Sequence, residues 1–309
     1  MAQPRLALIA LLAAVVAVTP LAIDMYLPAM PQITEQLTTT PGLVQQSLSI
    51  FLAFYALGML LFGPLADMIG RRKLAIGGLS AFALVSLLLS LAPTIEWFLA
   101  GRAAQAFVGS AATVVIPGLI RALYQENTAK GMSYVSMMMM LAPLLAPAIG
   151  SLLLLWGQWP LIFVVLAAYA LVIGVLCMRF LPEVRIPRPA DSPAPAFFSS
   201  YRLVLSNRLA QPLIAISMFA SFSFFCFLTA VPFVYIEHFG VDAQLFSLLF
   251  GFNVCALIIA NFSNSKLVTR FGSERLLHWA FLSGLLFASI LVAVSIFAGP
   301  LWLTALAIA

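Results

Sequence analysis

Charged residues are scarce in this 309-residue sequence, in which Asp, Glu, Lys and Arg together make up 8%. Soluble domains carry about 25% of these residues, because polar side chains must cover the surface around an apolar core. Here 63% of the residues are hydrophobic and the mean hydropathy is +1.11. A bilayer removes the need for a polar cover. The composition therefore excludes an ordinary soluble domain and indicates an integral membrane protein.

Cysteine and histidine are also rare, with three and two residues. Cys177, Cys226 and Cys255 each lie inside an apolar run, which suits small buried side chains better than a disulfide framework or a metal cluster. His238 and His278 are too far apart in the sequence to suggest a metal site. The sequence has neither a Walker lysine loop nor a Gly-x-Gly-x-x-Gly motif. We expect no metal and no cofactor.

The net charge of +5 does not indicate a nucleic-acid partner, because 25 Phe and so few charges leave no basic binding face. The basic residues instead report topology, since Lys and Arg are retained in the cytoplasm. With Arg5 and the N-terminus placed inside, fourteen of the fifteen basic residues fall on the cytoplasmic side. Arg102 is the exception. We expect a multi-pass protein of a bacterial inner membrane, embedded in the lipid bilayer, with a cytoplasmic N-terminus.

Nine apolar stretches are long enough for membrane helices, which need about 20 residues each. Gly and Pro residues separate them at the expected turns. A tenth stretch opens at Leu301. The start of the chain also has features of a signal peptide, but the apolar stretch continues beyond them and is interpreted as the first helix. The nine predicted spans are 6–30, 43–69, 74–92, 97–122, 131–155, 160–181, 209–236, 243–264 and 276–297.

A Pro-rich polar connector divides these spans into two groups. We expect residues 1–181 to form a six-helix bundle, 182–200 to be a cytoplasmic linker and 201–309 to hold helices seven to nine and the start of a tenth. A weak repeat supports two matched halves, because Gly70 and Gly272 follow the second and eighth spans at an offset of 202 residues. A complete protein of this type would have about 400 residues and twelve helices. The sequence is therefore expected to be truncated.

Asp24 and Arg102 are charged residues predicted to lie at membrane depth. An acidic residue there costs about 2.5–3.5 kcal/mol, so it is a candidate functional group. Asp24 lies about six residues and Arg102 about five residues from the external end of its helix, at nearly equal depth. Arg102, Gln105 and Gly109 share one helix face at i, i+3 and i+7. We expect Asp24 to exchange a proton and Arg102 to be coupled to it across a cavity. Alternatively, Asp24 faces external water and Arg102 extends to the lipid headgroups.

The turn after the second span carries a dense motif. Gly70 suits a tight reversal after a helix, and the basic residues that follow it are suited to pairing with Asp67 at the membrane boundary. The segment resembles the signature loop of the major facilitator superfamily, Gly-x-x-x-Asp-x-x-Gly-Arg-Arg/Lys, although Met68 replaces a basic residue common there. The resemblance implies a gating loop that contains Gly63, Asp67, Gly70, Arg71 and Arg72.

Two further segments are similar to motifs of the same superfamily. The run from Arg102 to Gly109 is similar to the helix-four motif, whose arginine the family associates with proton coupling. The run from Ala142 to Gly150 is similar to the motif of drug/proton antiporters, although Ala146 and Ser151 replace usual glycines. The resemblance implies that the antiporter motif contains Pro143, Pro147 and Gly150.

The closer resemblance is to the bicyclomycin-resistance subfamily, through 23–31, 232–237 and 270–272. It implies an all-α membrane protein with the major facilitator fold, two six-helix bundles that are truncated here to about nine and a half helices. It also implies a monomer that exchanges a proton for a drug through a central cavity, and no enzymatic activity. An exporter of a metabolite such as a sugar or amino acid remains the alternative. A polytopic membrane enzyme would require clustered catalytic groups, which the sequence does not show.

We expect the cavity to be apolar and adaptable, because methionine packs against varied ligands. Tyr26, Gln105 and Asn253 are its candidate polar contacts for a small-molecule drug, although Asn253 is equally suited to a hydrogen bond between helices. Several apolar residues are also candidates for the cavity lining, but each of them could instead contact lipid or pack against a neighbouring helix. These are Met132, Met137–Met140, Met218, Phe222, Phe224 and Phe225.

Overall fold

The computed structural model describes residues 6–124, 128–183, 205–208 and 210–296. Some side chains within these ranges, including those of Asp67 and Met137, are outside the description. The predicted linker lies almost wholly outside it, and so does the tenth apolar stretch. The predicted division into a first bundle, a linker and a second bundle therefore remains a prediction.

Every regular element in the described ranges is helical, as an apolar environment requires, because a helix satisfies its own backbone hydrogen bonds. Eight of the described helical segments are long and apolar enough to cross a membrane, and the part of α7 from Leu141 to Trp156 is a shorter apolar segment. The elements are α1 (Leu6–Asp24), η1 (Leu27–Ala29), α2 (Met30–Gln36), α3 (Pro41–Ile69), α4 (Arg71–Leu89), α5 (Ile95–Thr113), α6 (Ile116–Tyr124), α7 (Thr128–Trp156), α8 (Pro160–Phe180), α10 (Ala210–Pro232), η3 (Phe233–His238), α11 (Ala243–Phe271) and α12 (Ser273–Ile296).

Three of the spans that were predicted to be continuous helices are interrupted. The first span breaks after Asp24 into a turn, a short 3₁₀ segment and α2, where Pro28 and Pro31 lack the N–H that a continuous helix would use. The fourth span breaks between α5 and α6, just before Pro117. The seventh ends in the π-helical turn η3, directly after Pro232. The first break leaves carbonyl groups in the last turn of α1, among them that of Ala22, without helical partners.

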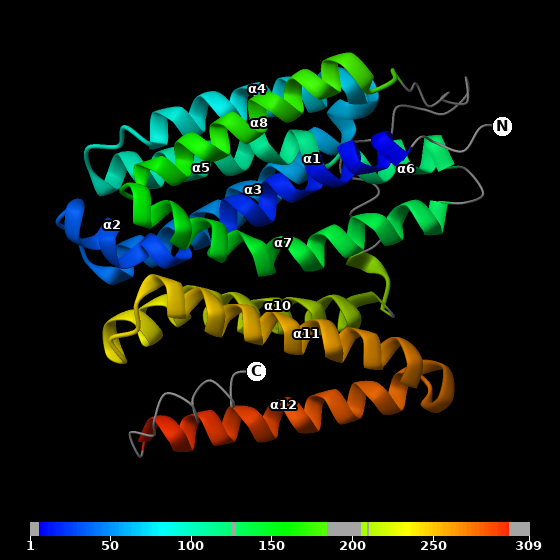
Figure 1. The fold of residues 1–309 in the computed structure, drawn as a ribbon. Helices are drawn as coiled ribbons and strands as arrows, with labels where there is room; N and C mark the ends of the chain where they lie inside the picture. The colour runs from blue at the N-terminus through cyan, green and yellow to red at the C-terminus, as the bar shows by residue number, and fades with distance from the viewer. Residues whose placement is uncertain (1–5, 125–127, 184–204, 209, 297–309) are drawn as a thin grey trace.

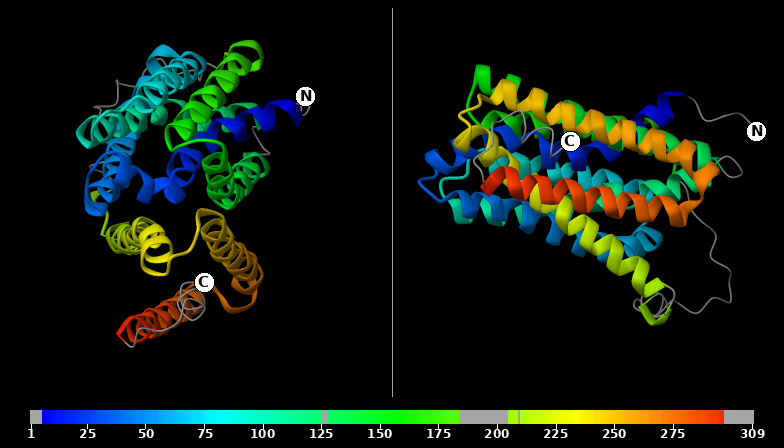
Figure 2. Two further views of the ribbon diagram at one scale, coloured as in Figure 1. Left: turned by 60° about the vertical axis from the view of Figure 1, so that its left-hand side comes forward. Right: turned by 90° about the horizontal axis from the view of Figure 1, so that it is seen from below.

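The six spans before the connector pack together, and α10 to α12 lie along one side of that group (Figures 1 and 2). The most extensive contacts inside the first group join α3 to α5, α4 to α5 and α8, and α1 to α7. Across the boundary α7 packs along α11, while α12 lies outermost. The two groups therefore meet along α1, α3 and α7 on one side and α10 and α11 on the other.

Successive helices alternate in direction, so the turns gather at two ends of the molecule (Figure 1). Gly70, between α3 and α4, and Gly272, between α11 and α12, have φ of +95° and +80°, which L side chains rarely adopt. Both glycines lie at the same end as the start of α1, and this end also holds the last turns of α6, α8 and α11 with Arg121, Arg179 and Arg270. We refer to it as the basic end. These described basic residues thus gather at one end of the molecule, as the sequence predicted.

Candidate transport site

Arg102 is the largest fully buried side chain in the described part of the chain, at 0% exposure. Its Nη1 donates hydrogen bonds to the carbonyl oxygen of Ala22 at 3.0 Å and to Oε1 of Gln105 at 2.6 Å. Its Cζ lies 4.3 Å from the ring centroid of Tyr26 and 4.4 Å from that of Phe51. Cation–π attraction is strongest in such a desolvated setting. The predicted alternative, in which Arg102 extends outward to lipid headgroups, is wrong.

The break in α1 explains why a guanidinium lies here. Ala22 is in the last turn of α1, and its carbonyl carries part of the negative end of the helix dipole. A cation at this point satisfies that carbonyl and is itself stabilised by it. Gln105, one turn along α5, completes the network, because its Nε2 donates to Ser86 Oγ at 2.8 Å and Ser86 donates to Phe82 O at 2.7 Å. Arg102 thereby holds the end of α1 against α5 and α4.

Replacing Arg102 by Met is expected to destabilise the protein by about 3 kcal/mol, because the substitution keeps much of the volume but leaves the Ala22 carbonyl and Gln105 unpaired. The same change at Arg121, which is exposed at the basic end, is the matched control and should alter stability by less than about 0.5 kcal/mol. Thermal unfolding of the detergent-solubilised protein measures both. Equal melting temperatures for the two variants would contradict the role given to Arg102.

Asp24, the last residue of α1, is 4% exposed and faces a cavity between the two helix groups. The cavity has a volume of about 470 Å³ and is lined by α1, α7, α10 and α11. We refer to it as the central cavity. Among the described residues, none forms an ion pair or hydrogen bond with the Asp24 carboxyl group. Nε and Nη2 of Arg102 likewise have no hydrogen-bond partner. Asp24 is thus the end residue of α1, and Arg102 binds the carbonyl of Ala22 two residues before it, but the two charged groups form no ion pair with each other. Their coupling remains a prediction.

The central cavity is predominantly apolar, and Asp24, Asn253 and Thr19 supply the polar groups of its described lining. Asn253 lines it as predicted. Tyr26 and Gln105 do not, because both are fully buried within the first helix group. The Tyr26 hydroxyl hydrogen bonds with Ser47 Oγ at 3.0 Å, and the Gln105 amide is engaged by Arg102 and Ser86. Their predicted contact with substrate is therefore not supported by this placement.

The apolar lining agrees in part with the sequence. Met139, Phe224 and Phe225 line the central cavity together with Pro143 of the antiporter motif. Phe227, Leu228 and Phe250 also line it and were not singled out, because nothing in an apolar helix distinguishes the cavity face from the lipid face. The side chains of Met137, Met138 and Met140 lie outside the described residues.

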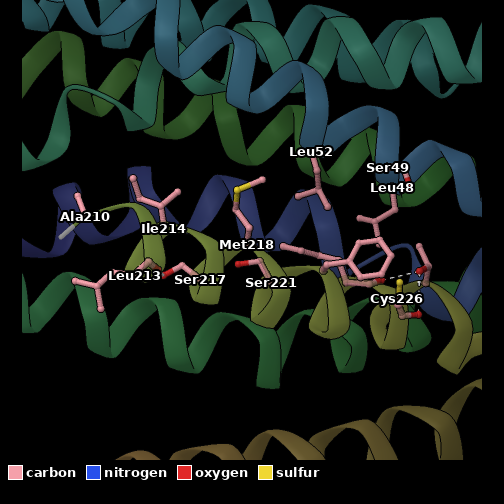
Figure 3. A pocket seen from close by; sticks show the side chains of 13 residues that line it. Leu48, Ser49, Leu52, Ala210, Leu213, Ile214, Ser217, Met218, Ser221 and Cys226 are labelled. Carbon is pink, nitrogen blue, oxygen red and sulfur yellow. Dashed lines mark hydrogen bonds between the residues drawn. The ribbon is translucent and has the colours of Figure 1, made fainter. Parts of the chain in front are cut away.

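A second cavity, of about 770 Å³, separates α3 from α10 (Figure 3). Figure 3 shows Leu48 and Leu52 of α3 facing Met218 and Cys226 of α10 across it. Phe222 and Phe225 also line it. Its described lining contains hydroxyl groups but no charged side chain, whereas the described lining of the central cavity contains the carboxyl group of Asp24.

The predicted antiporter motif in α7 brings the helix backbones close together. A Cβ atom at Gly150 would overlap the carbonyl oxygen of Met25, in the break that follows Asp24. Three residues before it, the carbonyl oxygen of Pro147 accepts a hydrogen bond of 2.9 Å from Ser247 Oγ of α11. The motif thus contacts the interrupted part of helix one on one side and the second helix group on the other.

The predicted gating loop joins three elements at the basic end. The Arg71 guanidinium packs against Gly118 of α6, where a Cβ atom would overlap it. Arg72 donates a hydrogen bond to the carbonyl oxygen of Met178, near the end of α8. Gly63 lies within α3, and Gly70 supplies the turn. The expected pairing of Asp67 with the basic residues falls outside the described side chains.

Taken together, the fold and the site define a polytopic membrane protein in which two groups of helices enclose an apolar cavity with one buried acid. The chain belongs to the Major Facilitator Superfamily, whose family model matches residues 12–309. This membership places it among transporters rather than enzymes and confirms the predicted fold class. The predicted resemblance to the bicyclomycin-resistance subfamily is confirmed by the relatives described next.

One relative, a "Bicyclomycin resistance protein homolog" of Haemophilus influenzae, is 32% identical over 304 residues, which cover 91% of this chain and 75% of the relative. A "Chloramphenicol resistance protein" of Pseudomonas aeruginosa is 29% identical over 302 residues, covering 94% and 70%. Among solved structures, a bacterial homologue of the human lysosomal transporter Spinster has a TM-score of 0.75 at 16% identity and covers 98% of this chain and 71% of that one. This structural likeness shows the fold.

Proposed function

We propose that this protein exports small drugs across the bacterial inner membrane in exchange for protons, working as a monomer with its N-terminus in the cytoplasm. The observation that carries the proposal is Asp24, a buried carboxyl group that faces the central cavity and has no ion-pair or hydrogen-bond partner among the described residues. An acidic residue at membrane depth is costly, and its retention in a cavity wall favours a role in carrying an ion.

The surroundings of Asp24 suit alternating occupancy by a proton and a substrate. Phe224, Phe225 and Phe250 provide an apolar wall for an amphipathic drug, which sits beside the carboxyl group. A drug that carries a positive charge competes with the proton for Asp24 directly, and an uncharged drug competes for the space around it. Arg102 does not pair with Asp24 but holds the helix end that carries it, so it positions the carboxyl group. The similarity to drug-resistance proteins supports this substrate class.

The direct test is a substrate-induced proton movement. The full-length protein is reconstituted in vesicles that enclose a pH-sensitive dye, and chloramphenicol or a lipophilic cation is added under a proton gradient. We expect proton flux that depends on the drug and on the protein. Drug movement without proton flux would contradict antiport, and proton flux driven by a sugar or an amino acid but by no drug would favour the metabolite exporter instead.

A further inference from the structure

Asn253 is an unexplained polar group in the wall of the central cavity. It lies on α11, opposite the α1 wall that carries Asp24. Its Oδ1 and Nδ2 atoms are shielded from solvent, and neither has a hydrogen-bond partner among the described residues. A buried amide without partners is unfavourable, and native proteins rarely retain one without a function.

Tyr235 is the neighbour that bears on the orientation of this amide. It lies in the π-helical turn η3, is 0% exposed, and packs against Phe246 with ring centroids 6.3 Å apart. Its hydroxyl is buried and close enough to the Asn253 side chain to interact with it, although no hydrogen bond of normal geometry joins it to any of the described residues. Single π-helical turns occur frequently at functional sites. The Asn253 amide and the Tyr235 hydroxyl are thus neighbouring polar groups in a part of the protein that is otherwise apolar.

We propose that Asn253 is a binding subsite for a neutral hydrogen-bonding group of the exported molecule, such as an amide or a hydroxyl, and that Tyr235 positions its side chain. An asparagine amide offers two donors and a carbonyl acceptor, so it can meet the N–H and C=O of a ligand amide at once. The apolar neighbours Phe250, Val254 and Leu257 exclude water and so strengthen such hydrogen bonds.

The inference rests on the proposed function but adds a specificity that Asp24 does not supply. Asp24 and Asn253 belong to different helix groups, so they contact different parts of a ligand. The carboxyl group selects for charge, and the amide selects for a hydrogen-bonding group whatever the charge. Substrates that lack such a group gain nothing from Asn253 and leave its amide unpaired.

The test measures equilibrium binding of two probes to the purified full-length protein. Chloramphenicol carries an amide and hydroxyl groups, whereas tetraphenylphosphonium has no conventional hydrogen-bonding group. With Asn253→Leu, we expect the dissociation constant of chloramphenicol to rise about tenfold, the effect of losing one well-made buried hydrogen bond, and that of tetraphenylphosphonium to change less than about twofold. With Tyr235→Phe, we expect about a threefold rise for chloramphenicol alone.

The matched control is Thr229→Val, which removes a hydroxyl of α10 that already bonds to its own helix at Phe225 O, and it should leave both constants unchanged. Equal weakening of both probes by Asn253→Leu, or no weakening of either, would overturn the subsite. So would a wild-type protein that binds neither probe. Probe-selective weakening in a protein that shows no proton flux would sustain the subsite while the antiport proposal failed.

Discussion

Asp24→Asn is expected to reduce drug-driven proton flux by about 100-fold, the lower end of what a positioned proton-transferring side chain contributes to a rate. The amide keeps the shape of the carboxyl group at the end of α1 but cannot carry a proton. Because this carboxyl group has no ion-pair or hydrogen-bond partner among the described residues, the substitution breaks no interaction there and should leave folding intact. Vesicle flux measurements and thermal unfolding of the same preparation separate the two effects.

The same substitution at Asp242 provides the control. Asp242 is exposed at the start of α11, where its Oδ1 accepts a hydrogen bond of 2.7 Å from the backbone N–H of Leu245. Asparagine serves equally well at such a position, so Asp242→Asn should transport normally. Asp24→Glu, which keeps a titratable group, should retain part of the flux. Normal flux in Asp24→Asn would rule out Asp24 as the proton carrier.

Gly150→Ala is the second change from which we expect a large effect. Its added methyl group would overlap the carbonyl oxygen of Met25, and a backbone atom cannot rotate away as a flexible side chain can. Forcing an extra group into a packed interface costs about 1–3 kcal/mol, and here the strain falls on the break in helix one beside Asp24. We expect a lower melting temperature and little transport.

Gly77→Ala is the matched control for this effect. Gly77 is exposed on α4, and a Cβ atom there would have no neighbour within 4 Å. Alanine in an open helical position is favoured over glycine by about 0.5–1 kcal/mol, so this variant should be slightly more stable and fully active. If Gly150→Ala had the same melting temperature and transport rate as Gly77→Ala, the close approach of α7 to helix one would not be required for stability or transport.

Several predictions from the sequence depended on properties that act locally, and these were confirmed. Apolar length determined the helices, whose bounds lie within three residues of the predicted spans except where proline interrupts them and at the end of α11, which continues to Phe271 beyond the predicted end at 264. Gly70 and Gly272 were assigned to turns, and both have positive φ. The motifs around Arg71, Arg102 and Gly150 indicated the family because each combines residue types at a strict spacing, and the family model matches nearly the whole chain.

The partners of these residues were less predictable. The partner of Arg102 is the backbone carbonyl of Ala22, and a carbonyl carries no signal in the sequence. Tyrosine and glutamine often contact ligands in cavities, yet Tyr26 and Gln105 are buried within the first helix group, where both form hydrogen bonds with other side chains. Periodicity cannot separate a cavity face from a buried face when both neighbours are apolar.

The sequence by itself determined that this protein is a helical membrane protein, because hydrophobic length, punctuation by Gly and Pro and the placement of basic residues are properties of segments. Its resemblance to the motifs of a transporter family indicated the function. Tertiary structure decided how its two charged membrane residues are used. Arg102 stabilises the end of a broken helix, while Asp24 lies in the wall of the central cavity with no partner among the residues that the structure describes. The physical reason is that the free energy of a buried charge depends on the dipoles, rings and cavities around it, which helices distant in the sequence provide.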